Sequence, residues 1–242
     1  MISIIPVEGL PEIGEGTDLG ALIAQRAPLE DGDVVVVAQK VVSKAEGRVV
    51  RLEDVEASDR ARELAGSWCD PRESEVILRE SKRVVRLRNA LVIAETAHGF
   101  VCASAGVDHS NAAEPATLVL LPVGPDASAR GIRESIRDSA GRDVAVIVTD
   151  SFGRPFRRGT TDVAIGVAGI APLLDLRGTP DRAGSILRST QVAVADEIAA
   201  AANLVRTSKA DGIPVVIVRG LTFSGDGEAT DLVMPAERDL FR

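Results

Sequence analysis

Four consecutive valines, residues 34–37, constrain the fold of this chain more than any other feature of its sequence. Valine is branched at Cβ, which favours strands, and the run is too short for a convincing helix. Residues 33–38 are therefore predicted to form a buried strand. A second strongly apolar segment, residues 143–149, predicts another.

The remaining pattern contains more strands than helices. Strands are expected at 2–7, 84–87, 91–95, 100–103, 117–122 and 213–218, and residues 163–170 are expected to form a strand or a tight turn. Helices are expected from 17 to before Pro28, at 58–68, after the Asp70–Glu73 cap, from a cap at Asp126 to near 141, and at 191–205. Residues 39–50 are expected to continue as loop and strand.

Regular βαβ alternation is missing from this order. The sequence therefore predicts an α+β fold with a large mixed sheet and packed helices rather than a doubly wound sheet. No linker-like stretch divides the chain, so residues 1–242 are treated as one module.

Composition excludes several classes of protein. The net charge of −8 and an aromatic content of 2% argue against nucleic-acid binding, which usually requires a basic surface or stacking platforms. Two cysteines without paired spacing do not predict a disulfide framework. The sequence shows no signal peptide and no apolar run of membrane-spanning length, so a cytoplasmic protein without membrane partners is expected.

Common nucleotide-binding motifs are missing. The chain has no G-x-x-x-x-G-K-[ST], and residues 14–16 do not follow the Rossmann pattern. An acidic protein that binds an anionic substrate needs metal ions or clustered basic residues to offset repulsion. Hard oxygen ligands next to arginine and lysine are therefore the pattern expected of such a site.

Two such groups follow predicted strands. Asp108 and Asn111 lie in a loop after the strand at 100–103, and Asp150 and Ser151 follow the apolar strand at 143–149. Carboxylate, amide and hydroxyl oxygens suit Mg²⁺ or Mn²⁺. The alternative for each group is a capped turn without a ligand.

Basic residues follow the second group directly. Arg154, Arg157 and Arg158 lie within five residues, and guanidinium groups match phosphate and carboxylate oxygens. Lys44, after the valine strand, could neutralise a phosphate. Asp196 and Glu197 are expected in the middle of the 191–205 helix, where such a pair is typical of a polar helix face, and their role stays open.

At these residues the chain resembles a known family. The segments 10–13, 34–47, 105–111, 149–155 and 192–198 are similar to successive blocks of the coenzyme F420-0:L-glutamate ligase family, in the family's order and over nearly the whole chain. The resemblance implies an unusual two-lobed topology that works as an intertwined homodimer. It also implies substrates GTP, F420-0 and L-glutamate, with Mn²⁺ or Mg²⁺ and K⁺.

The implied reaction transfers the γ-phosphate of GTP to the lactyl carboxylate of F420-0. The glutamate amine then attacks the acyl phosphate, and an amide, phosphate and GDP result. Later rounds extend the tail through γ-linkages, and no protein nucleophile is expected. The number of glutamates added, the metal used in the cell and the residues that bind the deazaflavin stay open.

The resemblance also assigns roles to residues. It implies that Asp108, Asp150 and Ser151 ligate metal, that Asp108, Asp150 and Arg154 form the catalytic set, and that GTP is held by Leu10, Pro11, Glu12, Ile13, Gln39, Lys44 and Asn111. Relatives often carry a small hydroxyl residue at position 39 and Thr at position 151. Some relatives carry a C-terminal flavin-dependent reductase domain, which we expect to be absent here.

The sequence leaves two alternatives open. One is a sister metal-dependent ligase or phosphotransferase that acts on another carboxylate. The other is a non-catalytic nucleotide-binding dimer, which would bind GDP and metal without turnover. The set Asp108, Asp150 and Ser151 disfavours the second alternative, because binding alone does not require a metal pair beside a phosphate.

Overall fold

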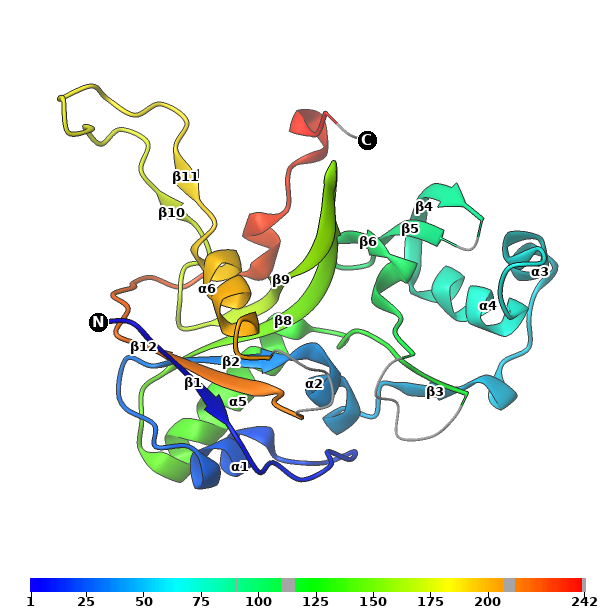
Figure 1. Cartoon of the computed structure of the whole chain (residues 1–242), viewed down its shortest axis with the longest axis horizontal. Coiled ribbons are helices and arrows are strands. Elements are labelled where there is room, and N and C mark those ends of the chain that lie inside the picture. The colour runs from blue at the N-terminus through cyan, green and yellow to red at the C-terminus, as the bar shows by residue number, and fades with distance from the viewer. Residues whose placement is uncertain (90, 110–115, 207–211, 241–242) are drawn as a thin grey trace.

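The computed structural model of the chain describes residues 1–89, 91–109, 116–206 and 212–240. Helices and strands are mixed along these ranges, which confirms the predicted mixed class (Figure 1). The two-lobed topology and the intertwined homodimer stay predictions. Within the described ranges, no helix is both long enough and apolar enough to cross a bilayer.

The largest sheet contains five strands in the order β1-β12-β2-β8-β9. β2 and β8 run parallel, whereas the other neighbours run antiparallel, so the sheet is mixed as predicted. The strands span Ser3–Val7 (β1), Val34–Ala38 (β2), Ala145–Arg154 (β8), Arg157–Ala168 (β9) and Val215–Arg219 (β12).

The valine run lies at the centre of this sheet and is buried on both faces. Val35 and Val37 pack into one hydrophobic cluster, which includes residues of α1 (Leu19–Arg26) and α5 (Pro125–Ala140). Val34 and Val36 pack into a second cluster with residues of α6 (Val194–Asn203). Because side chains alternate along a strand, four apolar residues in a row require cover on both faces, and the helices provide it.

β9 passes very close to the start of α5. A Cβ atom added at Gly166 would lie 2.3 Å from the Pro125 carbonyl oxygen, so only glycine fits there. One step along, the pairing with β8 shifts: Val148 pairs with Gly166, but Thr149 pairs with Ala164. This β-bulge sets the register from Thr149 to Gly153, after which the pairing shifts again at Arg154.

A second group of elements surrounds a three-stranded antiparallel sheet, β4-β5-β6. Its hydrophobic cluster contains Val76, Ile77, Val92 and Leu118, apart from the two clusters of the large sheet. The elements are β3 (Val49–Arg51), α3 (Asp59–Ala65), α4 (Pro71–Glu80), β4 (Ser81–Arg88), β5 (Leu91–Thr96), β6 (Val101–Ala103) and β7 (Thr117–Val119), with β3 paired to β7.

An arm formed by residues 174–192 projects from the large sheet (Figure 1). Two short strands pair at its base, β10 (Leu174–Asp175) and β11 (Gln191–Val192). The other elements are α2 (Gln39–Ala45) and the 3₁₀ turns η1 (Leu52–Asp54), η2 (Ser104–Gly106), η3 (Ala229–Leu232) and η4 (Ala236–Arg238).

Several local predictions were wrong in informative ways. Residues 39–45 form a helix rather than loop and strand, although no side chain caps its start. Asp126 does not cap α5; its Oδ1 accepts from the backbone N–H groups of Val167 at 2.7 Å and Ala229 at 3.0 Å. The helix predicted at 191–205 begins only at Val194, because residues 191–192 pair as β11. The errors at Asp126 and at residues 191–192 come from contacts with other segments that local propensity does not register.

Glu95 in β5 joins two strands of the small sheet. Its carboxylate, 8% exposed, accepts from Lys82 at 3.0 Å and from Arg83 at 2.7 Å, both on β4. Hydrogen bonds from Arg83 and Lys82 lower the pKa of Glu95 to about 2. A carboxylate with a depressed pKa stabilises the fold above its unfolded-state pKa, about 4.3.

We predict that Glu95→Gln lowers the free energy of unfolding by about 1 kcal/mol at neutral pH, a modest value because the half-exposed partners are screened by water. The difference between the two proteins should shrink as the pH falls from about 4.3 towards the folded-state pKa of about 2. Urea unfolding at several pH values measures this. A difference that stays constant across the acid range would contradict it.

Candidate active site

One pocket of about 880 Å³ collects most residues that the sequence singled out. Its walls come from the loop before α1, the start of α2, the loop before β7, the middle of the β8–β9 hairpin, and the segments after α6 and before β12. The lining residues are Leu10, Pro11, Glu12, Ile13, Ala38, Gln39, Lys40, Val41, Lys44, Asp108, Thr149, Asp150, Ser151, Thr160, Asp162, Asn203, Arg206, Gly212, Ile213 and Pro214.

The parallel pairing of β2 and β8 explains why these segments meet. Ala38 pairs with Thr149, so the two strands reach the same edge of the sheet in register. α2 begins at the residue after Ala38, whereas β8 continues through Asp150 and Ser151. The lysines of α2 and the polar residues of β8 are therefore placed at one edge, where ligands bind in sheets of this kind.

Three aspartates lie in this pocket. Asp108 comes from the loop that follows η2 and forms a backbone bridge with Val119. Asp150 comes from β8 and Asp162 from β9. Burial raises the pKa of Asp150 to about 7; the charges of Asp108 and Asp162 raise it too, while the Ser151 N–H and Lys40 oppose the rise. A cation beside Asp150 would stabilise its ionised form and displace the proton.

Two lysines of α2 contact acidic residues of the pocket, one in the Asp108 loop and one in the segment 10–13 that is predicted to bind the nucleotide. Lys40 Nζ lies 2.8 Å from Asp108 Oδ2, and Lys44 Nζ lies 2.5 Å from Glu12 Oε1. The Lys44–Glu12 ion pair joins two segments that the sequence assigned to the same ligand. No sequence pattern indicates a role for Lys40, which follows Gln39 directly; its contact with Asp108 places it in the site.

Asp162 and Arg206 form an ion pair that the sequence did not predict. Arg206 Nη1 donates to Asp162 Oδ2 at 3.0 Å and to Thr149 Oγ1 at 3.1 Å. Burial lowers the pKa of Arg206, and Asp162 opposes that shift. Asp162 belongs to the site because the register of the β8–β9 hairpin pairs it with Ser151. That register depends on the β-bulge, so sequence spacing alone does not show it.

The donor set fits a divalent cation that is shared with phosphate. In the described ranges no three His, Cys, Asp or Glu residues cluster as a complete protein cage. Mg²⁺ is commonly held by one or two carboxylates together with substrate phosphates and water. Asp108, Asp150 and the Ser151 hydroxyl supply oxygens of this kind in a pocket that also contains lysines.

Comparison with known proteins decides the family. The family model described as F420-0:gamma-glutamyl ligase matches residues 9–220. The chain belongs to this ligase family. Proteins named coenzyme F420:L-glutamate ligase are 43% identical to it in Methanothermobacter thermautotrophicus (100% of this chain and 99% of the relative), 46% in Methanocaldococcus jannaschii (95% and 92%) and 44% in Archaeoglobus fulgidus (100% and 96%).

One predicted site residue of this ligase-family chain, Arg154, is not part of the pocket lining. Arg154 ends β8 away from the pocket lining, and its Nη2 donates to the Arg158 carbonyl at 2.9 Å. The segment that the sequence presented as a basic loop is the tip of the β8–β9 hairpin, where Phe156 is 90% exposed. Asn111 lies outside the described residues. The catalytic role of Arg154 and the nucleotide contact of Asn111 stay predictions.

Asp196 has a contact that accounts for its position in α6. Its Oδ1 accepts from the Ala164 N–H at 2.8 Å, beside the β-bulge of β9. Asp196 is not part of the pocket lining, and it lies in the first turn of α6 rather than mid-helix. It holds the bulged strand against α6.

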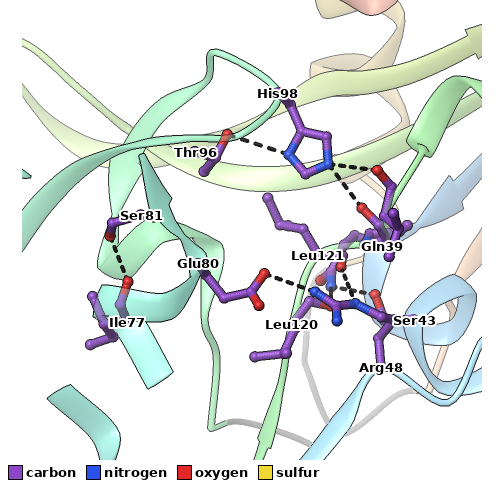
Figure 2. Close-up of polar contacts among 12 residues, drawn as sticks. Gln39, Ser43, Arg48, Ile77, Glu80, Ser81, Thr96, His98, Leu120 and Leu121 are labelled. Carbon is purple, nitrogen blue, oxygen red and sulfur yellow. Dashed lines mark hydrogen bonds and ion pairs between the residues drawn. The ribbon is translucent and has the colours of Figure 1, made fainter. Parts of the chain in front are cut away.

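Gln39 takes part in a set of contacts that hold the chain after β7. Figure 2 shows Gln39 beside Leu120, Arg48 beside Leu121, and His98 at the far end of the same segment. Gln39 Nε2 donates to Leu120 O at 2.8 Å and to Ser43 Oγ at 2.7 Å. Gln39 lines the pocket, but its side-chain nitrogen is thus engaged within the protein, and its nucleotide contact stays a prediction.

Arg48 and His98 hold the next carbonyl groups along the chain, those of residues 121–123. Arg48 Nε donates to Leu121 O at 3.0 Å, and its Nη2 pairs with Glu80 at 2.8 Å. His98 Nε2 lies 3.0 Å from Pro122 O and 3.1 Å from Val123 O. The loop of Asp108 is bridged to β7 directly before this segment, so these contacts fix Asp108 relative to α2.

We predict that Gln39→Leu lowers the free energy of unfolding by about 1–3 kcal/mol, because the buried Leu120 carbonyl loses a hydrogen-bond donor. Denaturant unfolding measures the change. Gln25→Leu on the exposed surface of α1 is the matched control, expected within about 0.5 kcal/mol of the parent protein. Equal stability of the two variants would show that the contact with Leu120 contributes nothing net.

Proposed function

We propose that this chain is a GTP-dependent ligase that adds L-glutamate to coenzyme F420-0 and extends the product through γ-linkages. The observation that carries the proposal is the pocket that gathers Asp108, Asp150 and Ser151 beside Lys40 and Lys44. Such a site combines oxygen ligands for a cation with basic groups for phosphate. Membership of the F420-0:gamma-glutamyl ligase family supports the choice of acceptor.

The nucleotide is proposed to lie along the segment 10–13 and α2. Leu10, Pro11 and Ile13 would hold it mainly through backbone groups, and Lys44 would neutralise phosphate charge. The Lys44–Glu12 pair joins the two segments before any ligand binds. Because lysine is a flexible point charge with three donors, Lys44 can exchange this carboxylate for a phosphate without moving its helix.

The proposed reaction proceeds in two displacements. The carboxylate of F420-0 attacks the γ-phosphorus of GTP, the bond to the GDP oxygen breaks, and an acyl phosphate forms. The amine of glutamate then attacks the acyl carbon and phosphate leaves, with loss of a proton from nitrogen. The first step converts a poor electrophile into one with a good leaving group, so no protein nucleophile is needed.

Asp108, Asp150 and Ser151 are proposed to hold Mn²⁺ or Mg²⁺. When bound, a divalent cation neutralises charge on the phosphoryl group and helps to align the attacking oxygen. Lys40, which pairs with Asp108 at 2.8 Å, supplies positive charge at the same place. A K⁺ requirement, a cytoplasmic location and a homodimeric assembly belong to the proposal as properties implied by the family resemblance.

Mass spectrometry tests the proposed reaction directly. Purified F420-0 is incubated with the protein, glutamate, Mn²⁺ and GTP, and we expect a product heavier by one or more glutamyl residues. Reactions without GTP, or with ATP in its place, are the controls and should give no product. Failure to form product from intact substrates and folded protein would contradict the proposal. A measurement of GDP binding would then distinguish two explanations. A protein that binds GDP would be a sister ligase or a binding protein, whereas a protein that does not bind GDP would have a wrongly assigned nucleotide site.

We further predict that Asp150→Ala lowers kcat by more than about 100-fold, because it removes a metal ligand. The variant should unfold at the same temperature as the parent protein or higher, since the Asp150 carboxyl is desolvated and repelled by its neighbours. Asp143→Ala, whose side chain is 74% exposed, is the control with unchanged activity. Unchanged turnover in Asp150→Ala would remove Asp150 from the metal site.

A further inference from the structure

Ser151 directs its hydroxyl proton towards Asp162. Ser151 Oγ lies 2.6 Å from Asp162 Oδ1, and the two residues are opposite one another in the β8–β9 hairpin. An ionised carboxylate only accepts hydrogen bonds, so the hydroxyl is the donor. With its proton committed to Asp162, the serine oxygen keeps its lone pairs for another partner.

Asp162 is itself held firmly. It is 4% exposed, and its second oxygen accepts from Arg206 at 3.0 Å. Arg206 is fixed in turn through Nη2, which donates to Val36 O and Pro214 O, each at 3.0 Å. The guanidinium is thus tied to β2 and to the residue before β12, and it fixes the plane of the carboxylate.

These contacts engage Asp162 within the protein. Both of its carboxylate oxygens are occupied by protein donors, and its charge is balanced by Arg206. Partners of this kind orient a metal ligand without binding the metal themselves, and losing one commonly weakens metal affinity.

We propose that Asp162 is a positioning residue of the ligase: held by Arg206, it turns the Ser151 hydroxyl so that the oxygen faces the divalent cation. This inference rests on the proposed metal site at Asp108, Asp150 and Ser151. It adds a requirement that those three residues alone do not contain, namely the acceptor on β9 that sets the direction of the hydroxyl proton.

Asp162→Asn is the most informative change because it preserves size. Arg206 will take the amide oxygen, so the amide N–H₂ faces Ser151. The serine oxygen must then accept, and its proton turns towards the pocket, where it repels a cation. Mn²⁺ affinity should fall by about tenfold or more.

The experiment measures Mn²⁺ binding to the full chain in the presence of GDP, with free Mn²⁺ followed by electron paramagnetic resonance. No turnover is needed. Asp162→Asn is compared with Ser151→Ala and with the double variant. Because Asp162 acts through Ser151, the double variant should bind Mn²⁺ no more weakly than Ser151→Ala alone. Asp196→Asn is the matched control: the Asp196 carboxylate accepts from the Ala164 N–H of β9 and lies outside the pocket lining, so this variant should match the parent protein.

Other outcomes overturn the inference in distinct ways. Losses that multiply in the double variant would make Asp162 a direct ligand. Lower thermal stability without metal, combined with unchanged Mn²⁺ affinity, would make its role purely structural. If Asp162→Asn does not fold, Asp162→Glu retains the pair with Arg206 but displaces the acceptor, and it should weaken Mn²⁺ binding in the same way. A parent protein that binds no Mn²⁺ with GDP would instead contradict the metal part of the proposed function.

Discussion

The parallel pairing of β2 with β8 is the constraint on which the rest of the molecule depends. It brings the valine run and the apolar core of β8 together at the centre of the large sheet, buried from both faces. It also aligns the ends of the two strands, so that Lys40 and Asp150 reach the same pocket. Core packing and site geometry therefore follow from one register.

The pocket places several negatively charged side chains close together at the edge of the large sheet. Asp150 is desolvated and repelled by two neighbouring carboxylates, which is costly in the protein alone. Lys40 and Arg206 offset part of that cost, each bound to a different carboxylate. Sites that violate ordinary burial rules in this manner are typical of ligand binding, because the bound cation or substrate completes the balance.

The loop of Asp108, which also lines the pocket, is positioned by a different kind of interaction. Asp108 belongs to the elements around the three-stranded sheet and reaches the pocket because it is bridged to β7. The carbonyls after β7 are held by Gln39, Arg48 and His98, which come from separate parts of the chain (Figure 2). Their contacts span 24 to 81 residues in sequence, so no local pattern indicates them.

The sequence by itself determined the central strands, several helices and the residue types of the site. Runs of β-branched residues, the cap at Asp70 and the polar residues after apolar strands depend on local chemistry, which a sequence displays. Tertiary structure alone decided that residues 39–45 are helical, that Arg154 lies outside the pocket lining, and that Asp162 and Arg206 join Ser151. Those outcomes depend on a β-bulge and on packing between distant segments, and the free energy of such contacts is not written in any short stretch of chain.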